Sequence, residues 1–186
     1  MRTPYIGITD FMNQDQALAM LDLFRQQSIN PSERKLMIGV MCSYKVLNGL
    51  PTKWNNTFPR PEDIHKIFVD NPYAFNTLHY ADYKGIELAK SLEKLAPLCR
   101  PNLHAIQFDM TWPDPIVVKT FKSKYPNIQL VLQVNTTALN QVDNSVTKLI
   151  IRLSLYRDCI DYVLLDKSMG RGKPMQTKEL LPYIQA

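Results

Sequence analysis

The strongest constraint on the fold is a repeated alternation between short apolar runs and amphipathic stretches. The pair occurs six times, with apolar runs at residues 5–9, 36–44, 75–80, 103–108, 128–134 and 162–165. Short apolar runs are typical of buried strands, and the longer stretches have the spacing of amphipathic helices. Strands that alternate with helices imply right-handed crossovers and a parallel sheet. The sequence therefore predicts an α/β protein.

Polar residues inside the strands favour a closed barrel over an open, doubly wound sheet. The fifth strand alternates two sets of side chains, which are Gln129, Val131, Gln133 and Asn135 on one face and Ile128, Leu130, Leu132 and Val134 on the other. A sheet covered by helices on both faces needs nearly continuous apolar strands. A barrel instead has a lumen that opens into a site at the C-terminal ends of its strands. We therefore predict a TIM-type (β/α) barrel.

The number of strand–helix units indicates how much of a barrel the chain contains. A complete barrel has eight units and usually about 250 residues, whereas this chain has six units in 186 residues. An open six-stranded sheet exposes two edges, which favours aggregation. We therefore expect one (β/α)-barrel domain over residues 1–186, truncated before its last two units. An unusual partial barrel, or one whose last units were lost or never built, is the alternative.

The composition of the chain limits which classes of partner and which cellular compartment we expect. The net charge is +5, but Lys and Arg are dispersed rather than grouped, which argues against nucleic acid and leaves anionic metabolites. No run approaches the roughly 20 apolar residues of a membrane span, and the N-terminal residues lack a signal-peptide core. Cys42, Cys99 and Cys159 are far apart in the sequence, so we expect reduced thiols, a cytoplasmic protein and no metal site.

The last apolar run leads into the best candidate site. Asp166 directly follows it, and a carboxylate at a strand end can serve as a general acid or base. Capping a helix or bracing a loop is the alternative role. Gly170, Arg171, Gly172 and Lys173 come next. Glycines allow close backbone approach, and successive N–H groups with two cations suit a phosphate. A flexible basic turn is the alternative here.

Other strand ends supply further candidates. Asp109 is predicted to be a second acid–base group or a ligand for a sugar hydroxyl, although capping the next helix is an alternative for which Asp114 is better placed. Asp10 and Cys42 are further candidates for a base. His79 has two interpretations, a hydrogen-bonded structural histidine or a base.

Two segments resemble the phosphoribosylanthranilate isomerase family. Residues 6–9, Ile-Gly-Ile-Thr, resemble that family's opening C-G-I-T strand. Residues 162–166, Tyr-Val-Leu-Leu-Asp, with the glycines at 170 and 172, resemble its L-L-D strand and following G-G-T-G loop. The resemblance implies a cofactor-free (β/α)₈ barrel that performs an Amadori rearrangement, in which a ribose ring opens and a proton moves to give a ketose.

The resemblance also assigns roles by position. Asp166 matches the general acid, and Gly170 and Gly172 match glycines that hold the substrate phosphate. Ile6 stands where the family has its cysteine base, and Asp109 stands where it has a histidine. We therefore expect an isomerase that acts on a phosphorylated sugar or its arylamine adduct. The alternatives are a catalytically inactive barrel that binds a phosphorylated metabolite or a protein partner, and, less favoured, a nucleic-acid-binding domain.

Overall fold

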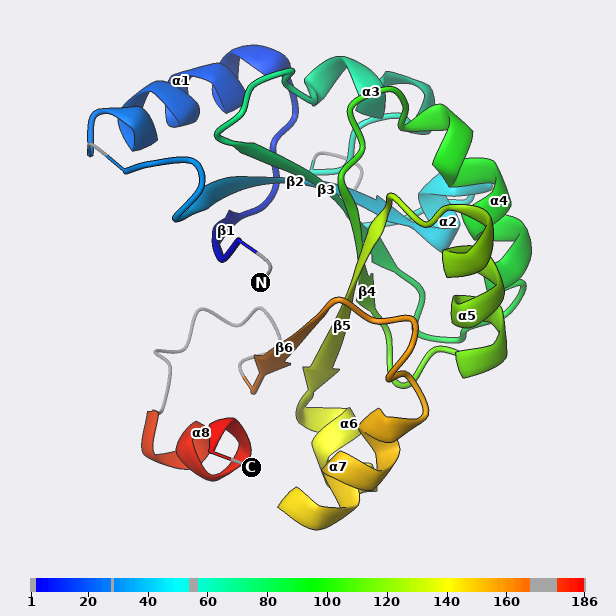
Figure 1. Ribbon diagram of the computed structural model, residues 1–186. Helices are drawn as coiled ribbons and strands as arrows, with labels where there is room; N and C mark the ends of the chain where they lie inside the picture. Colours follow the sequence, from blue (N-terminus) through cyan, green and yellow to red (C-terminus); the bar gives the residue numbers. More distant parts are fainter. Residues whose placement is uncertain (1–2, 28, 54–56, 168–176, 186) are drawn as a thin grey trace.

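The computed structural model describes residues 3–27, 29–53, 57–167 and 177–185. Its centre is one parallel sheet whose strands follow the order of the sequence and curl into a half-barrel (Figure 1). The strands are β1 (Tyr5–Ile8), β2 (Lys35–Ser43), β3 (Ala74–Ala81), β4 (Ala105–Asp109), β5 (Gln129–Asn135) and β6 (Tyr162–Asp166). The prediction of an α/β protein with six parallel strands is confirmed.

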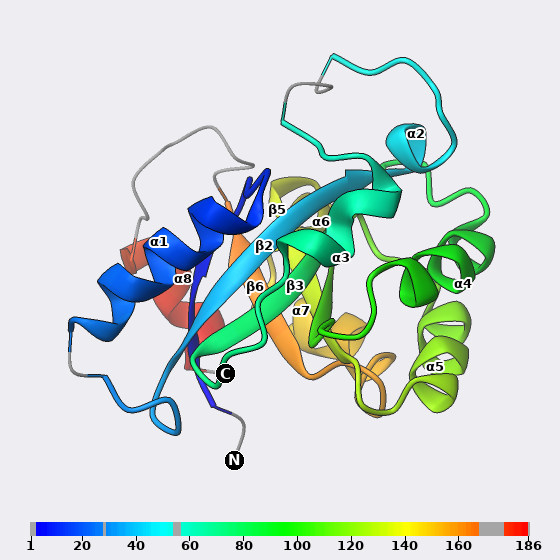
Figure 2. The ribbon, with the colours of Figure 1, turned by 90° about the horizontal axis from the view of Figure 1, so that it is seen from above.

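The helices lie on the convex side of the curled sheet, as two perpendicular views show (Figures 1 and 2). They are α1 (Gln14–Arg25), α2 (Tyr44–Leu47), the 3₁₀ helix η1 (Pro61–Asp63), α3 (Ile64–Ile67), α4 (Leu88–Leu98), α5 (Pro115–Lys124), α6 (Thr136–Gln141), α7 (Val146–Ser154) and α8 (Thr177–Ile184). Among these described helices, none is both long and apolar enough to span a bilayer.

Two helices begin at side chains that cap them: Asn13 caps α1, and Asp114 caps α5 as predicted. The side chain of Asn13 accepts a hydrogen bond from the backbone N–H of Gln16 at 2.9 Å. Asp114 accepts from the N–H of Ile116 at 2.8 Å, with Pro115 in the first turn of α5. Such caps satisfy N–H groups that have no partner within the helix. Because Asp114 occupies this position, Asp109 does not cap α5.

Two details of the helices differ from expectation. The sequence predicts an inward face of Ile116, Val117, Thr120 and Phe121 on α5. Phe121 is buried and Val117 is partly buried against the core, but Ile116 is 76% exposed, Thr120 is exposed and Val118 is buried. The helix α6 was not predicted; it begins where the side chain of Asn135 accepts from the N–H of Ala138 at 2.9 Å.

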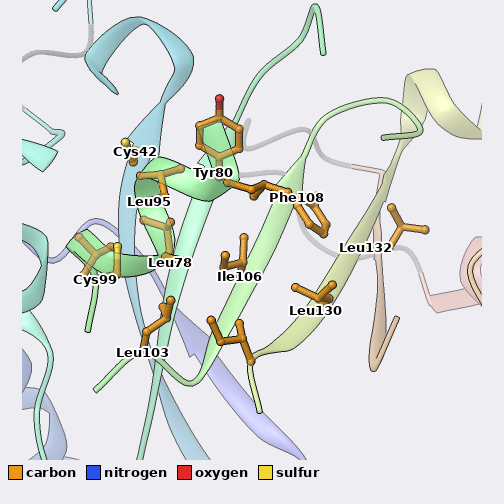
Figure 3. Close-up of a cluster of buried hydrophobic side chains, with 14 of the residues drawn as sticks. Cys42, Leu78, Tyr80, Leu95, Cys99, Leu103, Ile106, Phe108, Leu130 and Leu132 are labelled. Atoms are coloured by element: carbon orange, nitrogen blue, oxygen red, sulfur yellow. The ribbon is translucent and has the colours of Figure 1, made fainter. Parts of the chain in front are cut away.

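The main hydrophobic core lies between the convex face of the sheet and the helices (Figure 3). Its strand residues alternate along the chain, as a pleated sheet requires. They include Leu78, Tyr80, Ile106, Phe108, Leu130 and Leu132, all fully buried. The prediction that one face of β5 is wholly apolar and covered by helices is therefore confirmed.

The two edge strands approach each other at the N-terminal end of the sheet. The hydroxyl of Tyr162, at the start of β6, donates to the backbone oxygen of Thr3 at 3.1 Å. The rings of Tyr5 and Tyr162 have centroids 5.2 Å apart. Phe75, Met37 and Ala105 complete a small cluster, which is separate from the main core and lies at the N-terminal end of the concave side. The concave side therefore forms a lumen with an apolar N-terminal end.

Candidate functional site

The parallel register places polar side chains from neighbouring strands at one end of the lumen. His79 on β3 is level with Gln107 on β4, and Ala81 is level with Asp109. On the other side, Asn135 of β5 is level with Asp166 of β6. All these positions lie in the C-terminal halves of parallel strands, where α/β proteins concentrate their functional groups.

A chain of side-chain hydrogen bonds crosses β4, β5 and β6. Gln107 Nε2 donates to Gln133 Oε1 at 2.9 Å, and Gln133 Nε2 donates to Asp166 Oδ2 at 2.9 Å. Both glutamines are almost completely buried, and Asp166 is half-buried. These bonds determine the orientation of both side-chain amides. Gln133 must turn its nitrogen to the carboxylate, because only the amide nitrogen can donate, and its oxygen is then left to accept from Gln107. Asp166 is thus held from one side by a rigid amide and faces the lumen.

A second group surrounds Asp109 at the end of β4. The hydroxyl of Tyr83 donates to Asp109 Oδ2 at 3.2 Å. The same oxygen lies 3.6 Å from Nε2 of His79, and the side chains of His79 and Asp109 are only 12% and 15% exposed. Burial, and then the charge of Asp109 and the hydrogen bond to it, raise the pKa of Tyr83 to about 12. Tyr83 therefore remains a neutral donor near pH 7.

The loop after β3 brings Tyr83 to Asp109. The side chain of Asp82 accepts from the N–H groups of Lys84 and Gly85 at 3.2 and 3.0 Å, which forms a tight turn. Gly85 has a φ of +62°, a conformation that glycine adopts without strain. Tyr83 was not among the residues predicted from the sequence, because its contact depends on this turn and on a partner 26 positions along the chain.

Two candidate residues from the sequence lie apart from these groups. Asp10 is exposed after β1, with a φ of +70°, and makes no hydrogen bond or ion pair with a described residue of the site. Cys42 points into the main core and is fully buried (Figure 3). Burial raises the pKa of its thiol to about 12, so its proposed role as a base is wrong.

Ile6 occupies the position that the resemblance assigns to a catalytic cysteine. Its neighbour Tyr5 belongs to the lumen cluster, and a Cβ placed on Gly7 would meet Met37 on the same side. Because successive strand residues alternate in direction, Ile6 points to the outer face, where it is 42% exposed. A base attached at this position would not enter the lumen.

The predicted phosphate loop, Gly170, Arg171, Gly172 and Lys173, lies outside the described residues. Within the described part of the chain, no three His, Cys, Asp or Glu side chains are grouped closely enough to hold a metal ion.

Two hollows lie away from the acid–base groups. A cavity of about 140 Å³ at the N-terminal end of the sheet is lined by Lys35, Phe75, His104 and Tyr162, among others. Ligand pockets usually measure about 300–1,000 Å³, so this cavity is small for a metabolite. A larger hollow of about 470 Å³ lies between α2 and η1, lined mainly by apolar and proline residues from Val46 to Pro61. Neither contains a carboxylate suited to acid–base chemistry.

The site therefore consists of two carboxylates, a buried imidazole, a phenol and two glutamines, all on the C-terminal half of the lumen. Comparison with protein-family models, with curated proteins and with solved structures found no significant match to this chain.

Proposed function

We propose that the protein is a sugar-phosphate isomerase of the phosphoribosylanthranilate isomerase type, working as part of a TIM-type barrel in the cytoplasm. The observation that carries this proposal is the hydrogen-bonded chain from Gln107 through Gln133 to Asp166. It holds a carboxylate at a strand end in the lumen, where the resemblance assigns a general acid. The three cysteines are free thiols, which agrees with a reducing compartment.

In this proposal, Asp166 starts the reaction by protonating the ring oxygen of the substrate ribose. Gln133 donates to Oδ2 of Asp166 at 2.9 Å, which holds the carboxyl group in place for this transfer. The ring C–O bond then breaks, and the nitrogen lone pair forms a C=N bond. A proton must next leave the adjacent carbon to give the ketose. The phosphate is held by Gly170, Arg171, Gly172 and Lys173, as the resemblance implies.

Turnover of phosphoribosylanthranilate by the full-length protein tests this proposal. Asp166→Asn keeps an acceptor for Gln133 but removes the transferable proton, so we expect turnover to fall by about 10²- to 10⁴-fold. Asp158→Asn is the matched control, because Asp158 is exposed and its ion pair with Lys119 is long, at 3.9 Å. Undiminished turnover in Asp166→Asn would show that the assigned acid is wrong.

The second candidate function is a catalytically inactive barrel that binds a phosphorylated metabolite. The observation in its favour is Ile6, which carries no proton and points away from the lumen. Calorimetry with ribose 5-phosphate separates the two functions. Saturable binding without any turnover supports the binding protein, turnover supports the isomerase, and the absence of binding counts against both.

A further inference from the structure

We propose that His79 is the catalytic base of this site, with Asp109 as the residue that positions its ring. This inference rests on the proposed isomerase function, and it identifies the group that removes the carbon-bound proton. The sequence leaves His79 as either a structural histidine or a base, and the resemblance does not assign it this role. The proposal follows from its burial, its lack of partners and its carboxylate neighbour.

The imidazole of His79 is enclosed but unsatisfied. Its side chain is 12% exposed, and neither Nδ1 nor Nε2 has a hydrogen-bond partner among the described residues. Buried polar atoms are nearly always paired, because an unpaired one costs about 1–3 kcal/mol. A histidine that served only the fold would have its ring nitrogens bonded. His104 illustrates this, since its Nδ1 accepts from the N–H of Asn76 at 2.9 Å.

Asp109 lies where it can orient the ring. Its Oδ2 is 3.6 Å from Nε2 of His79, which is slightly too long for a hydrogen bond in this state. Catalytic hydrogen bonds are often long before substrate binds and shorten in the complex. Tyr83 donates to the same oxygen and holds the carboxylate against β3. When His79 takes a proton, the imidazolium gains an adjacent negative charge, which stabilises it.

The other candidate bases are less suitable. Ile6 has no titrating group, Cys42 lies on the opposite face of the sheet with a raised pKa, and Asp10 is exposed and apart from the cluster. His79 lies two strands from β5, whose Gln133 holds Asp166, so base and acid face the same lumen from different strands.

The proton transfers balance with no added reagent. Asp166 protonates the ring oxygen, and the C–O bond breaks as the C=N bond forms at C1. His79 then takes the proton from C2, and the C–H electron pair becomes a C1=C2 double bond while the nitrogen returns to neutrality. The enol hydroxyl gives its proton back to Asp166, and His79 delivers its proton to C1, which leaves the ketone. Both residues end in their starting state.

Chemical rescue of full-length protein tests this role, with phosphoribosylanthranilate as substrate. His79→Ala should lower turnover by about 10²- to 10⁴-fold, and added imidazole should restore at least a tenth of the lost activity. His65→Ala is the matched control, because His65 lies on α3 outside the lumen and should retain full turnover without imidazole. His79→Gln, which keeps a polar side chain, serves if the alanine variant does not fold; it should lose activity to the same extent.

The outcomes separate this inference from the proposed function. Loss of turnover with imidazole rescue supports His79 as the base. Turnover that survives His79→Ala overturns the inference alone, as does a loss that imidazole leaves unchanged in a variant with wild-type thermal unfolding. Absence of turnover by the wild-type protein overturns the isomerase function and this inference with it.

Discussion

The two ends of the lumen are filled by different kinds of side chain. At the N-terminal end, Tyr5, Phe75 and Tyr162 form an aromatic cluster with ring centroids 5.0 to 6.0 Å apart. At the C-terminal end, His79 and Asp109 lie in the same lumen among amides and a second carboxylate. The aromatic end brings the edge strands together, and the polar end carries the groups that our proposal assigns to the substrate.

Buried polar side chains near the two ends also differ in how many hydrogen bonds they make. Near the N-terminal end, the side chain of Asn76 is fully buried and makes three hydrogen bonds, two with the backbone of Val69 and one to the oxygen of Asn102. At the C-terminal end, His79 has no partner among the described residues. Among the described residues, the amide of Asn76 is therefore fully bonded and the imidazole of His79 is not, and our proposal assigns the open ring nitrogens of His79 to the reaction.

The largest effect is expected from removing the aromatic cluster. Phe75 is 6% exposed and contacts both tyrosines, so Phe75→Ala should lower the free energy of unfolding by about 3–5 kcal/mol. Urea denaturation measures this change. Leu23→Ala is the control, since Leu23 is 54% exposed on α1 and should shift stability by less than about 0.5 kcal/mol. Equal effects in the two variants would contradict a stabilising role for this end.

A smaller loss is expected at Asn76. Asn76→Leu keeps the approximate volume but leaves the N–H and oxygen of Val69 and the oxygen of Asn102 without this partner. The free energy of unfolding should fall by about 2–3 kcal/mol, because buried unpaired groups are costly. Asn140→Ala removes an amide on the exposed surface and should have little effect. If Asn76→Leu left the free energy of unfolding unchanged, the hydrogen bonds of Asn76 would not stabilise the fold, and the contrast with the unbonded His79 would be lost.

Substitution of His79 should raise the free energy of unfolding, whereas substitution of Phe75 or Asn76 lowers it. His79→Leu replaces an unsatisfied buried imidazole with an apolar side chain of similar size, so stability should rise by about 1–2 kcal/mol while any turnover is lost. Chemical denaturation and the isomerase assay measure the two quantities on the same sample. A loss of stability would mean that the imidazole is already well bonded, and the two ends would then follow the same rule.

Much of the fold was predictable because its signals are local. Apolar runs gave all six strands to within about two residues, and the caps at Asn13 and Asp114 followed from residue type. The helix α6 was missed, since its start depends on Asn135 turning from strand into cap. The buried face of α5 was only partly predicted, because adjacent helical residues differ in direction by about 100° and Val118 rather than Ile116 is buried.

The sequence predicted where in the fold the site lies, but it did not predict which side chains contact each other there. The strand-end rule selected His79, Asp109 and Asp166, and the register joins their strands at one end of the lumen. The contact between Tyr83 and Asp109 was not predictable, because it joins a loop to a strand across 26 positions. The sequence also could not show that Ile6 points outward. It indicates that alternate residues of a strand lie on opposite faces of the sheet, but not which of the two faces is the lumen.

The smallest effects should appear at alkaline pH, where tyrosines at the two ends lose their protons. Burial, and then the neighbouring Tyr162, raise the pKa of Tyr5 to about 12, from 10.0 for an unperturbed tyrosine. A folded-state pKa above the unfolded value adds stability that is complete below pH 10.0 and is lost as pH rises towards about 12. Tyr83 has a pKa raised to about 12 as well, but this residue is 73% exposed.

Urea denaturation at about pH 8 and about pH 11 compares the two tyrosines. Tyr5→Phe cannot ionise, so the alkaline loss of stability should shrink clearly in this variant. Tyr83→Phe should change that loss less, because solvent screens an exposed group. The neutral-pH stability of each variant serves as its own reference. A larger alkaline effect at Tyr83 would mean that the polar end contributes as much to stability as the aromatic end, which would overturn the division of roles between them.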